Sequence, residues 1–199
     1  MNPSRERGVV LFIALLVMVA LSLAAIALIR SADTATIVAG NLAFKQSAAA
    51  AADRGFEQAV QALFDPQSDP ATSNPVIANK TADSLAQNYF ASVRLKAGSI
   101  PEIPDELQSR SAYQGAGLSS ALATTDAAGN TTYYVIERMC ANPGVAVGSN
   151  CNLSAAGMGA DAGTQHYEAL QRPGDAFYRV TVRVEGPRNT VAYAQAILR

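Results

Sequence analysis

Cys140 and Cys151 are the residues whose type and spacing most directly suggest chemistry, and they are the only cysteines in the sequence. In a domain outside the cytoplasm, such a pair most simply forms a disulfide. The bond would close a 12-residue loop and, on chain-entropy grounds, stabilise the fold by about 3 kcal/mol. Two free thiols are the alternative, and two ligands alone do not make a zinc site.

The other residues that could do chemistry lack the neighbours that chemistry needs. His166 is the only histidine, and no nucleophile or carboxylate motif surrounds it. Asp65, Asp69, Asp126 and Asp161 lie in expected loops, and none fits a spaced calcium loop. We therefore expect no catalytic residue, metal or cofactor. The net charge of −1 offers no basic surface for a nucleic acid.

The element that dominates the sequence is an apolar run from Val9 to Ile29, whose only polar member is Ser22. As a helix it would span about 31 Å, which matches the hydrocarbon core of a bilayer. Its apolar side chains favour insertion by about 4–8 kcal/mol. A buried helix of a soluble core is the alternative, but a helix that is apolar on every side needs a large core to surround it, and the membrane span is favoured. Arg5 and Arg7 before the run, against Arg30 after it, favour a cytoplasmic N-terminus.

A cleaved secretory signal is the competing interpretation of this run. Ala25-Ile26-Ala27 offers a small-x-small cleavage site, which would leave a mature protein that starts at Leu28. The run is, however, longer than a usual signal-peptide core.

Helical periodicity continues beyond the apolar run. Apolar or small residues recur at helical spacing, at Val38, Leu42, Ala49, Ala52, Phe56, Val60 and Leu63. Asp65-Pro66 disfavours further helix. The sequence therefore predicts one long helix over 9–64, apolar on all sides over 9–29 and amphipathic over 30–64.

The rest of the chain predicts loops and a small antiparallel sheet. Residues 65–79 indicate a loop and residues 97–130 an irregular segment. Residues 132–139, 177–184 and 190–198 indicate strands, the last two joined by a turn at 186–189. Tyr178, Val180, Val182 and Val184 share one face of their strand. That face needs a cover, and the amphipathic half of the helix can provide it. We expect an α+β fold.

The start of the chain resembles a known class of leader. Arg5-Glu6-Arg7-Gly8 followed by Val9-Val10-Leu11-Phe12-Ile13 is similar to the class III signal peptide of type IV prepilins. Residues 7–15 and Gly40-Asn41-Leu42-Ala43-Phe44 resemble the PilX family of minor pilins. The resemblance implies a pilin-like fold, with a leader at 1–8, a transmembrane and filament-core helix at 9–29, an amphipathic helix at 30–64 and a periplasmic head at 65–199.

The resemblance also implies a processing step and partners. A prepilin peptidase would cut between Gly8 and Val9 and methylate the new amine of Val9. The protein would cross the inner membrane once, with its N-terminus in the cytoplasm and its head in the periplasm, and then enter a pilus on the cell surface. Its partners would be the major pilin, other minor pilins, an inner-membrane platform driven by an ATPase, and a tip adhesin.

Two positions depart from the usual pilin pattern. Val9 stands where major pilins usually have Phe, and Ile13 stands where most pilins have Glu. In the family this carboxylate is thought to pair with the amine of the subunit already added, and a buried charge is costly unless it is paired. A subunit without it suits the pilus tip.

Three other functions remain open at this level. The tip pseudopilin of type II secretion is similar in lacking the Glu, although its head is usually larger. A membrane-anchored periplasmic enzyme or binding protein is the second possibility. The third is a secreted binding module released by signal peptidase.

Overall fold

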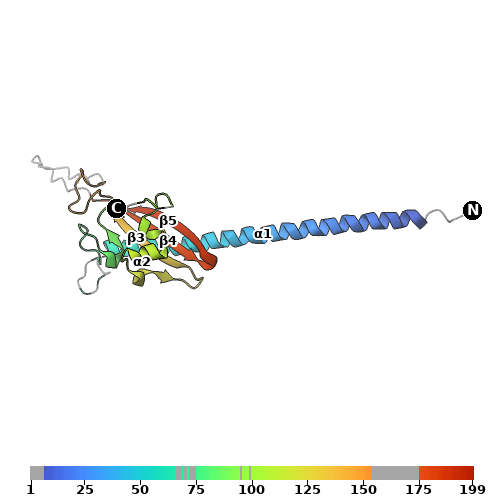
Figure 1. Ribbon diagram of the computed structural model, residues 1–199. Helices are drawn as coiled ribbons and strands as arrows, with labels where there is room; N and C mark the ends of the chain where they lie inside the picture. The colour runs from blue at the N-terminus through green and yellow to red at the C-terminus, as the bar shows by residue number, and fades with distance from the viewer. Residues whose placement is uncertain are drawn as a thin grey trace, which may run out of the picture. The chain divides into compact units, whose positions relative to one another are not determined.

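The computed structural model describes residues 7–65, 69, 71, 75–94, 96–98, 100–153 and 175–199, with the side chains of residues 7, 8 and 188 excepted. The chain divides into two compact units, the first ending at Gln46 and the second beginning at Ser47. A long N-terminal helix is followed by a small sheet (Figure 1), which confirms the predicted α+β fold.

Helix α1 (Arg7–Phe64) is continuous over 58 residues. It ends where Asp65-Pro66 was expected to stop it, with the backbone N–H of Asp65 still donating to the carbonyl of Gln61 at 3.1 Å. Phe64 then packs edge-on against Tyr178, with ring centroids 5.8 Å apart. The ammonium of Lys80 lies 4.8 Å from the centroid of the Phe64 ring, and burial lowers the pKa of Lys80. The end of α1 is thus held against the sheet.

The sheet has three main strands, β3 (Thr131–Arg138), β4 (Tyr178–Gly186) and β5 (Thr190–Leu198). Both neighbouring pairs are antiparallel, and the 3-10 turn η4 (Pro187–Asn189) joins β4 to β5. The predicted strands and hairpin are confirmed, with ends that shift by one or two residues. β2 (Thr124–Thr125) adds a short antiparallel partner to β3.

One strand pair differs from the expected antiparallel sheet. β1 (Tyr89–Phe90) lies parallel to β3, with Tyr89 opposite Ile136. The sheet is therefore mixed, in the order β1-β3-β4-β5. A two-residue strand is too short for side-chain alternation to show which strand it pairs with or in which direction.

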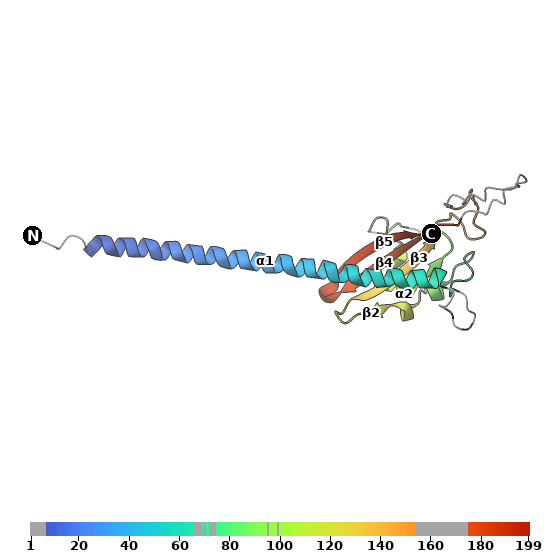
Figure 2. The ribbon, with the colours of Figure 1, turned by 180° about the vertical axis from the view of Figure 1, so that it is seen from behind.

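Both faces of the sheet are covered, α1 lying on one and α2 on the other (Figures 1 and 2). The expected irregular segment at 97–130 contains η2 (Asp105–Leu107), α2 (Arg110–Gly115) and η3 (Ser120–Leu122). Its side chains form a core with those of β1 and β3, made of Phe90, Ile103, Leu107, Tyr113, Leu118, Tyr133 and Val135. The opposite face carries the valines of β4, as predicted, and α1 covers it.

The face of α1 that meets the sheet is made of small residues. The buried positions are Ala48, Ala51, Ala52, Gly55, Ala59, Ala62 and Leu63. A Cβ on Gly55 would lie 2.9 Å from Cγ2 of Thr132 and 3.0 Å from Cγ1 of Val182. The helix backbone therefore approaches β3 and β4 too closely for large side chains.

This finding corrects most of the predicted docking face. Ala52 and Leu63 are buried as expected. Val38 and Leu42 are 60% and 55% exposed, Ala49 and Val60 are exposed, and Phe56 is half-buried. The predicted pattern follows large apolar residues, and these lie on a stripe of the helix next to the buried face. The buried face itself has mostly small residues, because the helix backbone lies so close to β3 and β4 that large side chains do not fit.

Candidate functional site

The most prominent feature of α1 is an apolar segment without any cover. All residues from 9 to 43 are exposed. An 18-residue window in this part has a mean hydropathy of 3.1 and none of it is buried. By length and composition, this helix is a candidate membrane anchor.

Two hydroxyl side chains in this segment are satisfied by the helix backbone itself. The hydroxyl of Ser22 donates to the carbonyl of Met18 at 2.7 Å, and that of Thr34 to the carbonyl of Arg30 at 2.9 Å. An unsatisfied hydroxyl in hydrocarbon costs several kcal/mol, and this bond removes the cost. Ser22 is thus compatible with an apolar surrounding.

The predicted processing residues lie at the beginning of α1. Gly8 and Val9 follow the first helical residue, Arg7, and the rest of the leader lies outside the described residues. Ile13 is 53% exposed and lies four residues after Val9, so the two side chains share a face of the helix. That face is uniformly apolar at this end.

In the head, Cys140 and Cys151 are joined by a disulfide, as predicted. The loop between them is held by further bonds. The backbone N–H of Asn142 donates to the side-chain oxygen of Asn150 at 3.0 Å, and the amide of Asn150 donates back to the carbonyl of Asn142 at 2.9 Å. The buried guanidinium of Arg138 donates to the carbonyl of Gly144 from outside the loop. The loop is therefore fixed independently of any partner.

The fixed loop presents apolar side chains to solvent. Val145 is 73% exposed and Val147 is 47% exposed. Exposed single valines are common on protein surfaces. They make the loop accessible but do not by themselves define a binding site.

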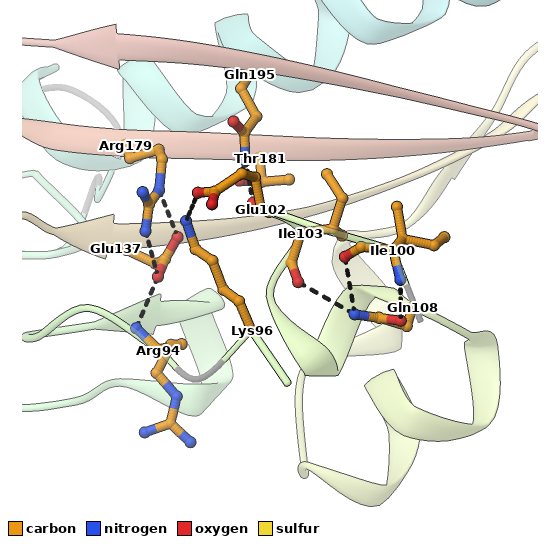
Figure 3. Close-up of polar contacts among 10 residues, drawn as sticks. All are labelled: Arg94, Lys96, Ile100, Glu102, Ile103, Gln108, Glu137, Arg179, Thr181 and Gln195. Atoms are coloured by element: carbon orange, nitrogen blue, oxygen red, sulfur yellow. Dashed lines mark hydrogen bonds and ion pairs between the residues drawn. The ribbon is translucent and has the colours of Figure 1, made fainter. Parts of the chain in front are cut away.

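An ion pair lies buried between the sheet and the segment that follows β1 (Figure 3). Glu137 of β3 is fully buried. Its carboxylate accepts hydrogen bonds from Nε and Nη2 of Arg179 at 2.8 and 2.9 Å, and from the backbone N–H of Arg94 at 2.7 Å. Glu137 and Arg179 are directly opposite in the β3–β4 register. This pair was not singled out from the sequence.

A second group of polar contacts holds the same segment against β5 (Figure 3). The side-chain amide of Gln195 donates to the carbonyl of Glu102 at 2.9 Å and to the hydroxyl of Thr181 at 3.0 Å. The amide of Gln108 donates to the carbonyls of Ile100 and Ile103. These contacts hold the segment that contains Glu102 and Gln108 against the sheet.

Of the candidate aspartates, Asp126 has a structural role. Its carboxylate accepts from the backbone and side-chain amides of Asn130 at 2.9 Å each, and these bonds lower the pKa of Asp126. Asn130 also donates to the hydroxyl of Ser47, and Arg54 lies 3.7 Å from the Asp126 carboxylate. The turn before β3 is thus tied to the part of α1 that belongs to the second compact unit.

The remaining candidates are not brought together. A side-chain oxygen of Asp69 accepts from the backbone N–H of Ala71. Asp161 and His166 lie outside the described residues. Among the residues that the structure places, no cluster of three or more His, Cys, Asp or Glu side chains could hold a metal ion.

The sequence carries one signal of the buried pair of Glu137 and Arg179. Both charges stand inside segments predicted as strands, and charged residues are seldom buried unless they are paired. The register that places them opposite each other could not be read without the structure.

We compared the sequence with family models and characterised proteins, and the fold with solved structures, and none of these comparisons gave a match.

Proposed function

We propose that this chain is a minor pilin that promotes assembly of a type IV pilus without catalysing a reaction. The observation that supports the proposal best is the apolar part of α1, which begins directly after Gly8 and is exposed from Val9 to Ile29. The same helix continues without a break into a disulfide-containing α+β head. This is the arrangement that the resemblance implies, which is strongest over residues 5–64.

The physical basis of assembly is an exchange of neighbours. An apolar helix is stable in lipid and comparably stable among other apolar helices, so leaving the bilayer for a helical filament core costs little. Packing between helices and contacts between heads can then decide where a subunit goes. Extraction of the subunit still needs external work, which we assign to the inner-membrane platform and its ATPase.

We further propose a place at or near the pilus tip. Ile13 lacks the carboxylate that would pair with the amine of a neighbouring subunit. A position with no subunit above it needs no such pair. There the protein would help to prime assembly with other minor pilins, join the major pilin below, and support a tip adhesin. Before assembly it would lie in the inner membrane, with its head in the periplasm.

The first test is the mature N-terminus of the full-length protein in its host. In cells with prepilin peptidase, mass spectrometry should find N-methylated Val9 as the first residue. In cells without the peptidase, the protein should keep residues 1–8 and assembly should stop. A start at Leu28 would instead support the secreted module, and a retained leader in normally piliated cells would contradict the proposal.

The second test concerns the tip position. An Ile13→Glu variant places a carboxylate on an apolar helix face, where an unpaired buried charge costs several kcal/mol. We expect several-fold fewer pili and altered binding of the other minor pilins. An Ile13→Leu variant keeps the apolar character and should behave like the parent protein. Unchanged piliation and unchanged partner binding in Ile13→Glu would count against the tip assignment.

The tip pseudopilin of type II secretion is the second candidate, because the departure at Ile13 fits it equally well. The two candidates differ in what the cell loses. Deletion of the gene should abolish pili if the first proposal holds, and should abolish secretion of exported enzymes if the second holds. Complementation with the full-length chain controls for effects on neighbouring genes.

A further inference from the structure

The outer strand of the sheet, β5, has an unusual composition. It spans Thr190–Leu198 and contains no charged residue, proline or glycine. It pairs with β4 through nine consecutive residue pairs, from Gly186 opposite Thr190 to Tyr178 opposite Leu198. The strand is therefore long and regular, without a bulge.

Its other edge has no strand beside it among the described residues. None of the backbone hydrogen bonds that these residues make outside the sheet ladders involves β5. Natural sheets protect open edges with lysines, prolines, bulges or very short strands. The opposite edge of this sheet, β1, is only two residues long and so has such protection. β5 has none of these devices.

Both faces of β5 carry uncharged side chains, most of them apolar, with Tyr193 and Gln195 as the polar members of the face opposite α1. On the face opposite α1, Val191 is 42% exposed and Ile197 is 57% exposed. On the α1 side, Ala192, Ala194 and Ala196 are half-buried. Because alanines are small, this side of the edge leaves room for larger apolar side chains of an added strand.

A second copy of the chain is a poor occupant. Two β5 strands could pair antiparallel about Ala194, since Val191 would then face Ile197 and no charges would meet. However, the two-fold axis of that pairing would make residues 47–64 of α1 run in opposite directions in the two copies. Two chains anchored in one membrane by the preceding part of the same helix enter from the same side.

We infer that β5 is a docking edge for an extended, uncharged segment of another protein of the assembly, which adds a strand to the sheet. Backbone hydrogen bonds supply affinity in this mode of recognition, and alternate side chains supply selectivity. The guest segment carries large apolar residues on its α1 side, where they cover the three alanines. The inference rests on the proposed function in two steps: it takes the partner from the same exported assembly, and it excludes a second copy through the shared membrane anchor.

Site-specific photo-crosslinking of the full-length chain in its host tests this inference. The photoreactive residue p-benzoylphenylalanine is placed at position 191 or at position 197, and position 145 on the disulfide loop is the control. Val145 is more exposed than either edge residue. Crosslinks from 191 and 197 should map by tandem mass spectrometry to the two ends of one proline-free, uncharged segment in a single partner. The control position should not reach that segment.

Charged edge variants provide the second measurement. Ile197→Lys and Val191→Lys place a lysine at the open edge, and we expect each to reduce crosslinking from the other edge position about ten-fold. Val145→Lys should leave it unchanged. Formation of the Cys140–Cys151 disulfide in each variant checks that the head has folded.

The outcomes separate this inference from the proposed function. Crosslinks to a second copy of this chain, crosslinks to a helical segment, or no crosslink at the edge would each overturn the inference, even if Val9 is the mature N-terminus. If a guest strand maps to β5 but residues 1–8 of this chain are never cleaved, the docking inference is supported and the pilin proposal is overturned.

Discussion

Replacing Glu137 with alanine should lower the unfolding free energy of the head by about 3–5 kcal/mol. The carboxylate is fully buried and accepts three hydrogen bonds, two from Arg179 and one from the backbone of Arg94. Its removal leaves the guanidinium of Arg179, whose side chain is only 12% exposed, without its partner. An uncompensated charge in that position costs more than the lost attraction alone.

Thermal unfolding of the full-length chain in detergent measures this effect. The head contains tyrosines and no tryptophan, so near-ultraviolet circular dichroism of the tyrosines follows its tertiary structure. For a domain of this size, the expected loss lowers the midpoint by about 10 °C.

A double substitution separates the charge from the packing. Glu137→Met with Arg179→Met removes both charges and keeps apolar volume, and such replacements of buried pairs are often neutral. The double variant should therefore recover most of the stability, apart from the orphaned N–H of Arg94, which costs about 1–3 kcal/mol. A Glu137→Ala midpoint equal to that of the parent protein would show that the pair does not stabilise the head.

Replacing Gly55 with leucine should have a comparable or larger effect on the head. A single added Cβ would already lie 2.9 Å from Thr132 and 3.0 Å from Val182, and a leucine adds three more carbons in the same place. Overpacking of this kind typically costs about 1–3 kcal/mol, and more where backbone must move. Here α1 would have to separate from β3 and β4, so we expect loss of cooperative unfolding in the same spectroscopic assay.

The control for this substitution lies in the same helix. A Cβ on Gly40 would have nothing within 4 Å. Gly40→Leu should leave the head transition unchanged and increase helix propensity by about 0.8–1 kcal/mol. If Gly40→Leu and Gly55→Leu unfold alike, close packing at Gly55 is not what holds the helix to the sheet.

The extent to which the fold could be predicted follows from the size of each signal. The apolar run and the three long strands each extend over enough residues for their pattern to identify them, and Asp65-Pro66 marks the end of the helix. The parallel pairing of β1 rests on two residues, and no pattern of that length is diagnostic. The short helices over residues 105–122 are similarly too brief to produce a period.

Two features of the candidate site could be predicted from the sequence, namely the disulfide from the single pair of cysteines and the candidate anchor from the apolar run. Two cysteines can form one pairing, so Cys140 and Cys151 were paired correctly. Most of the α1 face that packs on the sheet was not predicted, because alanine and glycine contribute little to a hydrophobic pattern. These small residues are needed there because the helix backbone lies close to β3 and β4. The pairing of Glu137 with Arg179 depends on strand register, which is a property of the folded sheet.

The exposed stretch of α1 between residues 30 and 43 has a mechanical consequence. Its side chains are all exposed, so it lacks the tertiary packing that supplies most of the stability of protein helices. At about 1.5 Å per residue the stretch is about 21 Å long, and fully extended it reaches about 46 Å. Under tension it can therefore elongate by roughly its own length, while the disulfide and the sheet of the head stay intact.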